Sequence, residues 1–267
     1  MKAFRAAHFD WKHRVTAFVS QRLFGNYTYT IRHGLANGMR RKGGLGFVPF
    51  EPAETAEIKF LRSLKLEGKT VYDLGAFEGV LALYFARRAK QVIAYEPNPR
   101  NFARCMENIR LNSLTNVQVL NRGISDREGE IELIYDPLMP GAGSSDDKIA
   151  EQINSSVKSF KKLSIAVVPL DRDIEDHHLP TPDLIKIDIE GLELAALRGM
   201  RATLSRYHPE LYIEMHGATE KEKVENAHAV VGLLEELGYK IYDVEHDRAL
   251  TLAELGNHRP GHLFCTA

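Results

Sequence analysis

From residue 70 onward, short apolar segments alternate with longer amphipathic ones, and this order constrains the fold more than any other feature. "TVYDLGA", "QVIAYEPN" and "DLIKIDI" have the length and apolar content of buried strands, and each precedes a segment with helical spacing. We expect further strands at "NVQVLNRGIS", "GEIELIYD", "SIAVVPL", "PELYIEMHG", "YKIYDVE" and "HLFCTA". Alternating strands and helices form a mostly parallel sheet with helices on both faces, so the sequence predicts an α/β, doubly wound fold.

Residues 1–45 differ from this pattern and predict an N-terminal helical extension with a linker. Nine Lys or Arg residues stand against the single acid Asp10 through Lys42. Within residues 2–24, Phe4, Trp11 and Phe18 recur at helical spacing, which predicts a basic amphipathic helix. Such a helix packs on the main domain or makes peripheral contact with a membrane. Residues 136–163 are rich in Gly, Ser and Lys, and predict a loop or cap insertion.

The net charge and the cysteine content bear on the partners and the location of the protein. The formal net charge is −1, so the charge balance gives no argument for a nucleic-acid partner. Two distant cysteines and the absence of a signal-peptide pattern favour a reducing, cytoplasmic location.

The first strand–helix turn contains Asp73, Gly75 and Gly79, and the next strand ends at Glu96. Ala76 replaces the second glycine of a dinucleotide-binding motif, and the Asp73 carboxylate would repel a diphosphate. An acid about twenty residues after such a turn can accept hydrogen bonds from both ribose hydroxyls. These features together require a ligand with a ribose, no diphosphate and a positive or amino-bearing tail. S-adenosylmethionine meets all three requirements.

Several segments resemble the FkbM family of S-adenosylmethionine-dependent methyltransferases, namely "TVYDLGAFEG", "VIAYEPNPRNF", "ISDREGEIEL" and "PDLIKIDIEGLELAALRGM". The resemblance covers roughly residues 45–267. It implies a class I methyltransferase fold, Rossmann-like and seven-stranded with the last strand antiparallel, and usually O-methylation of small molecules or glycans. Residues 46–267 would then form the methyltransferase domain.

The resemblance also implies which residues contact the cofactor. The methionine end, the ribose and the adenine would be contacted by Asp73, Gly75, Gly79, Glu96, Pro97, Gly123, Ile124 and Ser125. The chain departs from the family at Phe77 and Glu78, where small or polar residues are common. This departure concerns side-chain contacts of the turn and leaves its backbone role unchanged.

Two neighbouring strands end in polar residues that share a face by period two: Asp188 with Glu190, and Glu214 with His216. An alcohol must lose its proton as it attacks a methyl group, and a neutral His can accept that proton near pH 7. We predict His216 as the base, with Asp188 and Glu190 positioning the substrate. These groups could instead hold a divalent metal, although we predict none. A buried Lys186–Asp188 ion pair is the structural alternative.

The sequence therefore predicts a methyltransferase that uses S-adenosylmethionine to methylate a hydroxyl of a small molecule, sugar or glycolipid. One alternative is an NAD(P)-dependent oxidoreductase on the same sheet, which Ala76 and Asp73 disfavour. Another is a non-catalytic, membrane-associated binding module anchored by residues 2–24. We expect a small-molecule or glycan partner and no nucleic acid.

Overall fold

The computed structural model describes residues 23–43, 54–136, 139–144, 161–217 and 219–267. Its main sheet has eight strands in the order β13-β12-β14-β11-β10-β3-β4-β5. Their bounds are β3 Thr70–Leu74, β4 Gln91–Tyr95, β5 Val117–Leu120, β10 Leu184–Ile187, β11 Glu210–Glu214, β12 Lys240–Asp243, β13 Arg248–Leu250 and β14 His262–Thr266. Neighbours from β11 through β5 are parallel, whereas β14 runs antiparallel to both β11 and β12.

The doubly wound, mostly parallel sheet and its antiparallel last strand are therefore confirmed. The predicted number of seven strands is wrong, because β13 adds an eighth at the edge. Residues 244–247 form a turn that returns the chain antiparallel onto β12. Such a short hairpin gives no apolar run that sequence patterning can detect.

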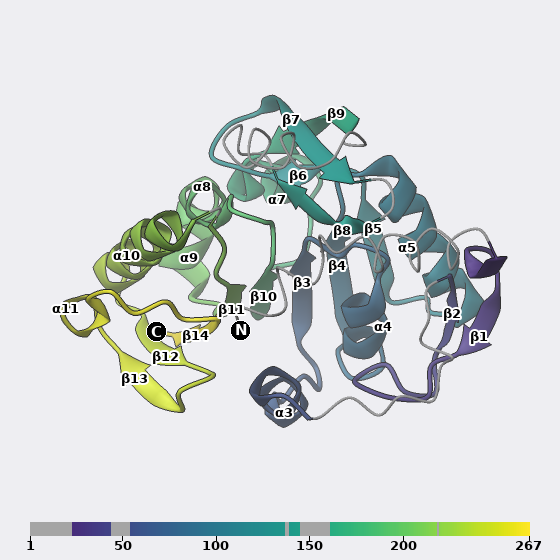
Figure 1. Cartoon of the computed structure of the whole chain (residues 1–267), viewed down its shortest axis with the longest axis horizontal. Coiled ribbons are helices and arrows are strands. Elements are labelled where there is room, and N and C mark those ends of the chain that lie inside the picture. Colours follow the sequence, from purple (N-terminus) through teal and green to yellow (C-terminus); the bar gives the residue numbers. More distant parts are fainter. Residues whose placement is uncertain (1–22, 44–53, 137–138, 145–160, 218) are drawn as a thin grey trace.

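Helices cover both faces of this sheet (Figure 1). One face packs against α7 (Leu170–Asp176), α8 (Glu193–Gly199), α9 (Arg201–Tyr207) and α10 (Glu220–Glu236), around Ile185, Leu197 and Val230. The other packs against α3 (Ala56–Ser63), α4 (Val80–Ala86) and α5 (Pro99–Leu111), around Val92 and Phe85. The remaining short helix, α11 (Leu252–Leu255), contacts α10. Both faces of the central parallel strands are largely apolar because both are covered, and Asp73 and Lys186 are buried exceptions.

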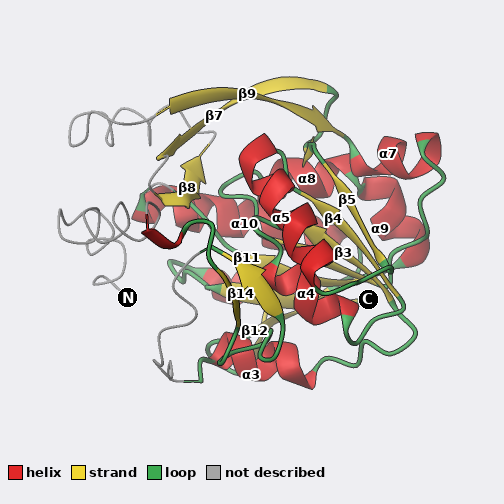
Figure 2. Ribbon diagram, turned by 90° about the vertical axis from the view of Figure 1, so that its right-hand side faces the viewer, coloured by secondary structure: helices red, strands yellow, loops and turns green. Residues whose placement is uncertain are grey.

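A second, four-stranded sheet has the order β6-β9-β7-β8 and lies apart from the main sheet (Figures 1 and 2). Its strands are β6 Gly123–Ile124, β7 Gly129–Asp136, β8 Met139–Ser144 and β9 Lys161–Val168. Residues 139–144 belong to the segment 136–163 that was expected to be a loop or cap, but they pair with β7 as a strand. Pairing gives their backbone groups hydrogen-bond partners that composition alone does not reveal. Residues 137–138 and 145–160 lie outside the described part.

The described part of the N-terminal extension is a hairpin of β1 (Thr28–Thr30) and β2 (Arg40–Lys42). Asn108 on α5 accepts a hydrogen bond from the Lys42 backbone N–H (2.8 Å) and donates one to the Glu78 carbonyl (2.8 Å). The hairpin thus docks on α5, and Asn108 joins it to the turn after β3. Residues 2–22 of the predicted amphipathic helix lie outside the described residues. No helix in the described ranges is long and apolar enough to span a membrane.

Candidate active site

The turn between β3 and α4 requires glycine at two positions. Gly75 and Gly79 have φ angles of +83° and +85°, which L side chains rarely adopt. A Cβ at Gly75 would lie 1.8 Å from the Asp188 carbonyl oxygen, and one at Gly79 would lie 2.7 Å from Cys105 Sγ. The Gly75 and Ala76 N–H groups both donate to the Tyr95 carbonyl, at 3.0 and 2.9 Å. The turn is therefore fixed between the ends of β4 and β10.

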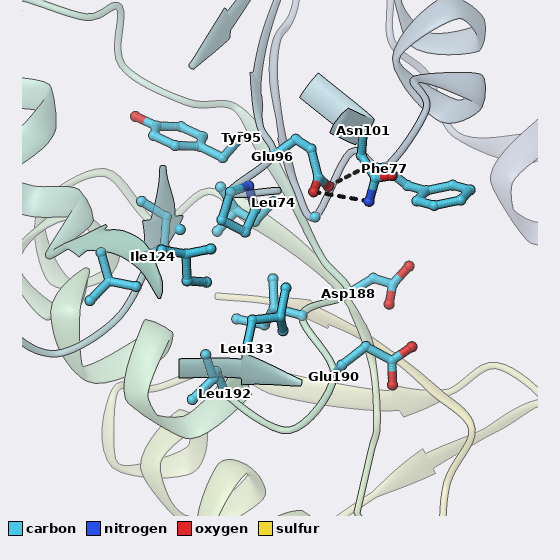
Figure 3. A pocket seen from close by; sticks show the side chains of 16 residues that line it. Leu74, Phe77, Tyr95, Glu96, Asn101, Ile124, Leu133, Asp188, Glu190 and Leu192 are labelled. Atoms are coloured by element: carbon cyan, nitrogen blue, oxygen red, sulfur yellow. Dashed lines mark hydrogen bonds between the residues drawn. The ribbon is translucent and has the colours of Figure 1, made fainter. Parts of the chain in front are cut away.

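Glu96 follows β4 directly and closes on this turn. Its carboxylate accepts hydrogen bonds from the Phe77 N–H (2.8 Å) and the Asn101 side-chain amide (3.3 Å) (Figure 3). It also accepts one from the Asn98 N–H (2.9 Å). Glu96 is only 5% exposed. Burial raises its pKa to about 7, although these three hydrogen bonds favour the ionised form. Glu96 is thus a buried acid that is held in place at the carboxyl end of the sheet.

A cavity lies between this end of the main sheet and the second sheet (Figure 3). The predicted site residues that line it are Gly75, Glu96, Pro97, Gly123, Ile124, Asp188 and Glu190. The predicted residues outside its lining are Asp73, Gly79, Ser125 and His216. Sequence reasoning missed an apolar wall formed by Leu133, Ile165 and Val167. The alternation of Ile165 and Val167 with polar or small residues indicated a strand face, but not which cavity that face would meet.

Asp73 is buried beneath the turn and contacts Lys186 rather than the cavity. Lys186 Nζ lies 3.0 Å from an Asp73 oxygen and 3.3 Å from an Asp188 oxygen, and donates to the Gly75 carbonyl (2.9 Å). Burial lowers the pKa of Lys186, but Asp73 and Asp188 outweigh it and raise the pKa overall. The expected Lys186–Asp188 pair is therefore present. It extends to Asp73, which supports the turn from below.

His216, just past β11, is surrounded by carboxylates. Its Nδ1 lies 2.9 Å from Glu193 Oε1, and its Nε2 lies 3.4 Å from Glu214 Oε1 and 3.8 Å from both Asp188 Oδ1 and Glu190 Oε2. Burial opposes the charged imidazole, but these acids raise its pKa to about 11. His216 is therefore an imidazolium at neutral pH, and its two nitrogens hold the acids together.

Among the acids around His216, Asp188 and Glu190 line the cavity, and the Glu190 side chain is the more exposed of these two (40% against 31%). The φ of Glu190 is +53°, a left-handed conformation that costs a non-glycine residue energy and often marks functional sites. Burial, with Asp188 and Glu214 nearby, raises its pKa to about 7 against the opposing effect of His216. One potential ligand atom each from Asp188, Glu214 and His216 lies within 4.8 Å of the others, close enough to hold a divalent cation.

The model of the methyltransferase FkbM domain matches residues 73–241, more than half of the chain. The chain belongs to the FkbM methyltransferase family. This membership confirms the predicted resemblance and the methyltransferase class.

The names of two relatives state an acceptor or a position of methylation. The hexuronic acid methyltransferase AglP of Haloferax volcanii is 28% identical over 62% of this chain and 64% of its own length. The 2-O-methyltransferase NoeI of Sinorhizobium fredii is 28% identical over 51% of this chain and 59% of its own length. The chain thus spans about three fifths of the length of each of these two relatives. The crystal structure of an FkbM methyltransferase from Methylobacillus flagellatus matches with a TM-score of 0.47 and 20% identity, over 77% of this chain and 45% of that one.

Proposed function

We propose that this FkbM-family chain is an S-adenosylmethionine-dependent O-methyltransferase acting on a hydroxyl of a small molecule, sugar or glycolipid. The observation that carries the proposal is a single cavity lined by both Glu96 and Glu190. Glu96 supplies a fixed carboxylate for a ribose, and Glu190 supplies a carboxylate for the acceptor. Nucleoside recognition and proton transfer would therefore take place on two sides of one cavity (Figure 3).

The lining residues fit the cofactor in shape and chemistry. Gly75 belongs to the lining, where it would contact the methionine end. Glu96 would accept hydrogen bonds from the ribose, while Pro97, Ile124 and Leu133 offer apolar surface to the adenine. When bound, the cofactor supplies an electrophilic methyl group. Asp73, Gly79 and Ser125 remain predicted site residues, and their positions outside the lining suit indirect support of the turns.

We further propose that Glu190, rather than His216, accepts the proton of the acceptor hydroxyl. Both His216 nitrogens face carboxylates, so the imidazole has no lone pair directed at the cavity. Glu190 reaches the cavity, and Asp188 beside it can position the hydroxyl. His216 would then stabilise the ionised acids electrostatically. Its predicted role as the base remains the competing hypothesis.

The pH dependence of turnover distinguishes these two bases. With Glu190 as base, kcat should rise to about pH 7 and then level off, and Glu190→Gln should lower kcat about 10²- to 10⁴-fold. With His216 as base, kcat should continue to rise toward about pH 11. A continued alkaline rise that survives Glu190→Gln would therefore assign the base to His216.

The names of two relatives support a sugar acceptor, because AglP is a hexuronic acid methyltransferase and NoeI a 2-O-methyltransferase. The acceptor side of this cavity is acidic, with Asp188 and Glu190 in its lining and Glu214 nearby. Like charges repel, so a neutral sugar fits this side better than a uronate unless a cation accompanies it. The expectations of a cytoplasmic location, no nucleic-acid substrate, no metal and membrane contact through residues 2–24 remain predictions.

Calorimetric titration with S-adenosylmethionine, S-adenosylhomocysteine and NADH tests the cofactor first. Micromolar binding of both sulfur nucleosides, lost in Glu96→Ala, would support the proposal. Tight NADH binding with no response to them would favour the oxidoreductase, and no binding of any would favour a non-catalytic module. An acceptor screen of neutral sugars, uronates and RNA, with EDTA or with Mg²⁺, then tests the substrate class and whether turnover requires a metal.

A further inference from the structure

A second group of potential metal ligands lies at the far end of β12, outside the cavity. Asp243 ends β12, His246 follows in the turn to β13, and His258 lies between α11 and β14. His246 Nδ1 is 3.0 Å from one Asp243 carboxylate oxygen and 3.1 Å from the other, while His258 Nε2 contacts Oδ2. The two rings lie edge to face, with centroids 4.7 Å apart. Two imidazoles from separate segments thus converge on one carboxylate.

The Asp243 carboxylate is buried without a permanent cation beside it. Its side chain is 0% exposed, and within the described ranges its ion pairs are with these two imidazoles alone. Buried carboxylates are normally paired with a cation or coordinate a metal. The two imidazoles and the His246 backbone N–H (3.2 Å) satisfy its hydrogen bonding. A bound divalent cation would place a permanent positive charge beside it.

The donor atoms select one class of cation. One potential ligand atom from each of the three residues lies within 4.8 Å of the others. Two imidazole nitrogens and one carboxylate oxygen suit Zn²⁺ and neighbouring transition metals, whereas Ca²⁺ and Mg²⁺ prefer oxygen ligands. We propose that Asp243, His246 and His258 bind one divalent transition-metal ion, represented by Zn²⁺. The His246 side chain is 51% exposed, so water can reach the fourth position.

The proposed ion would fix a turn that reaches toward the acceptor side of the cavity. Glu245, in the same turn, accepts a hydrogen bond from the His262 backbone N–H (2.8 Å) and contacts the His262 ring. His262 Nε2 lies 3.7 Å from Glu214, which in turn faces His216. A metal ion that connects the turn to the loop around His258 would hold Glu245 in place, and Glu245 begins the series of contacts that leads through His262 and Glu214 to His216. The site does not depend on the proposed methyl transfer.

Zinc binding to the metal-free full chain tests this proposal. Equilibrium dialysis against Zn²⁺ followed by elemental analysis should find one equivalent bound with a dissociation constant below about 10 μM. His246→Ala and His258→Gln should each weaken that equivalent at least tenfold, while circular dichroism verifies folding. Millimolar Mg²⁺ should not displace it.

The matched control is His216→Gln, because Asp188, Glu214 and His216 could also take up Zn²⁺. The equivalent assigned to Asp243 should survive this change. Three results would each overturn the proposal. They are loss of all tight zinc binding in His216→Gln, equal zinc binding by the wild type and by both His246→Ala and His258→Gln, and no tight zinc binding by any of these proteins. The last result would leave Asp243 as a hydrogen-bond acceptor for two histidines only.

Discussion

Cofactor affinity should depend on pH through Glu96. Burial raises the pKa of Glu96 to about 7 in the empty protein, although the N–H groups of Phe77 and Asn98 already favour the ionised form. Ribose hydroxyls that donate to the carboxylate would favour the ionised form further, so the complex should keep Glu96 charged below pH 7. Binding below pH 7 must then expel a proton. Affinity should fall about tenfold for each unit of pH below that value.

The magnitude follows from this linkage. Between pH 8 and pH 5.5 the dissociation constant for S-adenosylhomocysteine should rise about 30-fold, or ~2 kcal/mol. Glu96→Gln replaces the carboxylate with a neutral group of similar shape. At pH 8 it should therefore weaken binding by about the same ~2 kcal/mol, since hydrogen bonds to a charged group are lost. Calorimetric titrations of both proteins across this range measure both effects.

Glu190→Gln is the control, because Glu190 is the other cavity acid whose pKa is raised to about 7. This variant should retain the full pH dependence of binding, whereas Glu96→Gln should show none. If the dissociation constant of the wild-type protein does not change with pH, the proposed linkage is refuted. A pH dependence of binding that persists in Glu96→Gln but disappears in Glu190→Gln would show that Glu190, and not Glu96, is the group that titrates.

Changes around the turn should chiefly affect stability, as measured by urea unfolding. Gly75→Ala should cost at least about 2 kcal/mol, because its Cβ would meet the Asp188 carbonyl at 1.8 Å in a left-handed conformation. Lys186→Met should cost about 3 to 5 kcal/mol by leaving Asp73 buried without its cation, and adding Asp73→Asn should recover part of that loss. Asn108→Ala should lower the free energy of unfolding by about 1 to 3 kcal/mol, because the two backbone groups bonded to its buried side chain would lose their hydrogen-bond partner. A change below about 0.5 kcal/mol in any of these would contradict the corresponding contact.

Sequence patterning predicted the elements whose local pattern and tertiary environment agree. Strands β3, β4 and β10 are largely apolar, apart from the buried Asp73 and Lys186, because helices cover both of their faces. Strand β8 was missed because "MPGAGS" contains glycine and proline, which are depleted in strands. It pairs with β7, and that pairing is a property of the assembled sheet. The second sheet therefore could not be predicted as a unit.

Some residues of the candidate site could likewise be predicted from sequence, whereas others depend on how distant elements pack. Gly75, Glu96 and Asp188 were predicted together because carboxyl ends of parallel strands meet at one edge of a sheet. Glu193 could be identified from sequence only as an acid in the first turn of a helix. Its contact with His216 depends on how α8 packs against β11. The charge state of His216 follows from that contact, so sequence reasoning assigned it a neutral imidazole.

The acids around the cavity differ in a way that indicates where a ligand is needed. His216 contributes to lowering the pKa of Glu193 and of Glu214, and neither acid lines the cavity. Glu96 and Glu190 do line it, and burial raises the pKa of both to about 7. The fold thus pairs its supporting acids with His216 and the cavity acid Asp188 with Lys186, whereas burial outweighs the favourable contacts of Glu96 and Glu190. Two acids with raised pKa values in one cavity are best explained by partners that arrive with a ligand, such as ribose hydroxyls at Glu96 and an acceptor hydroxyl at Glu190.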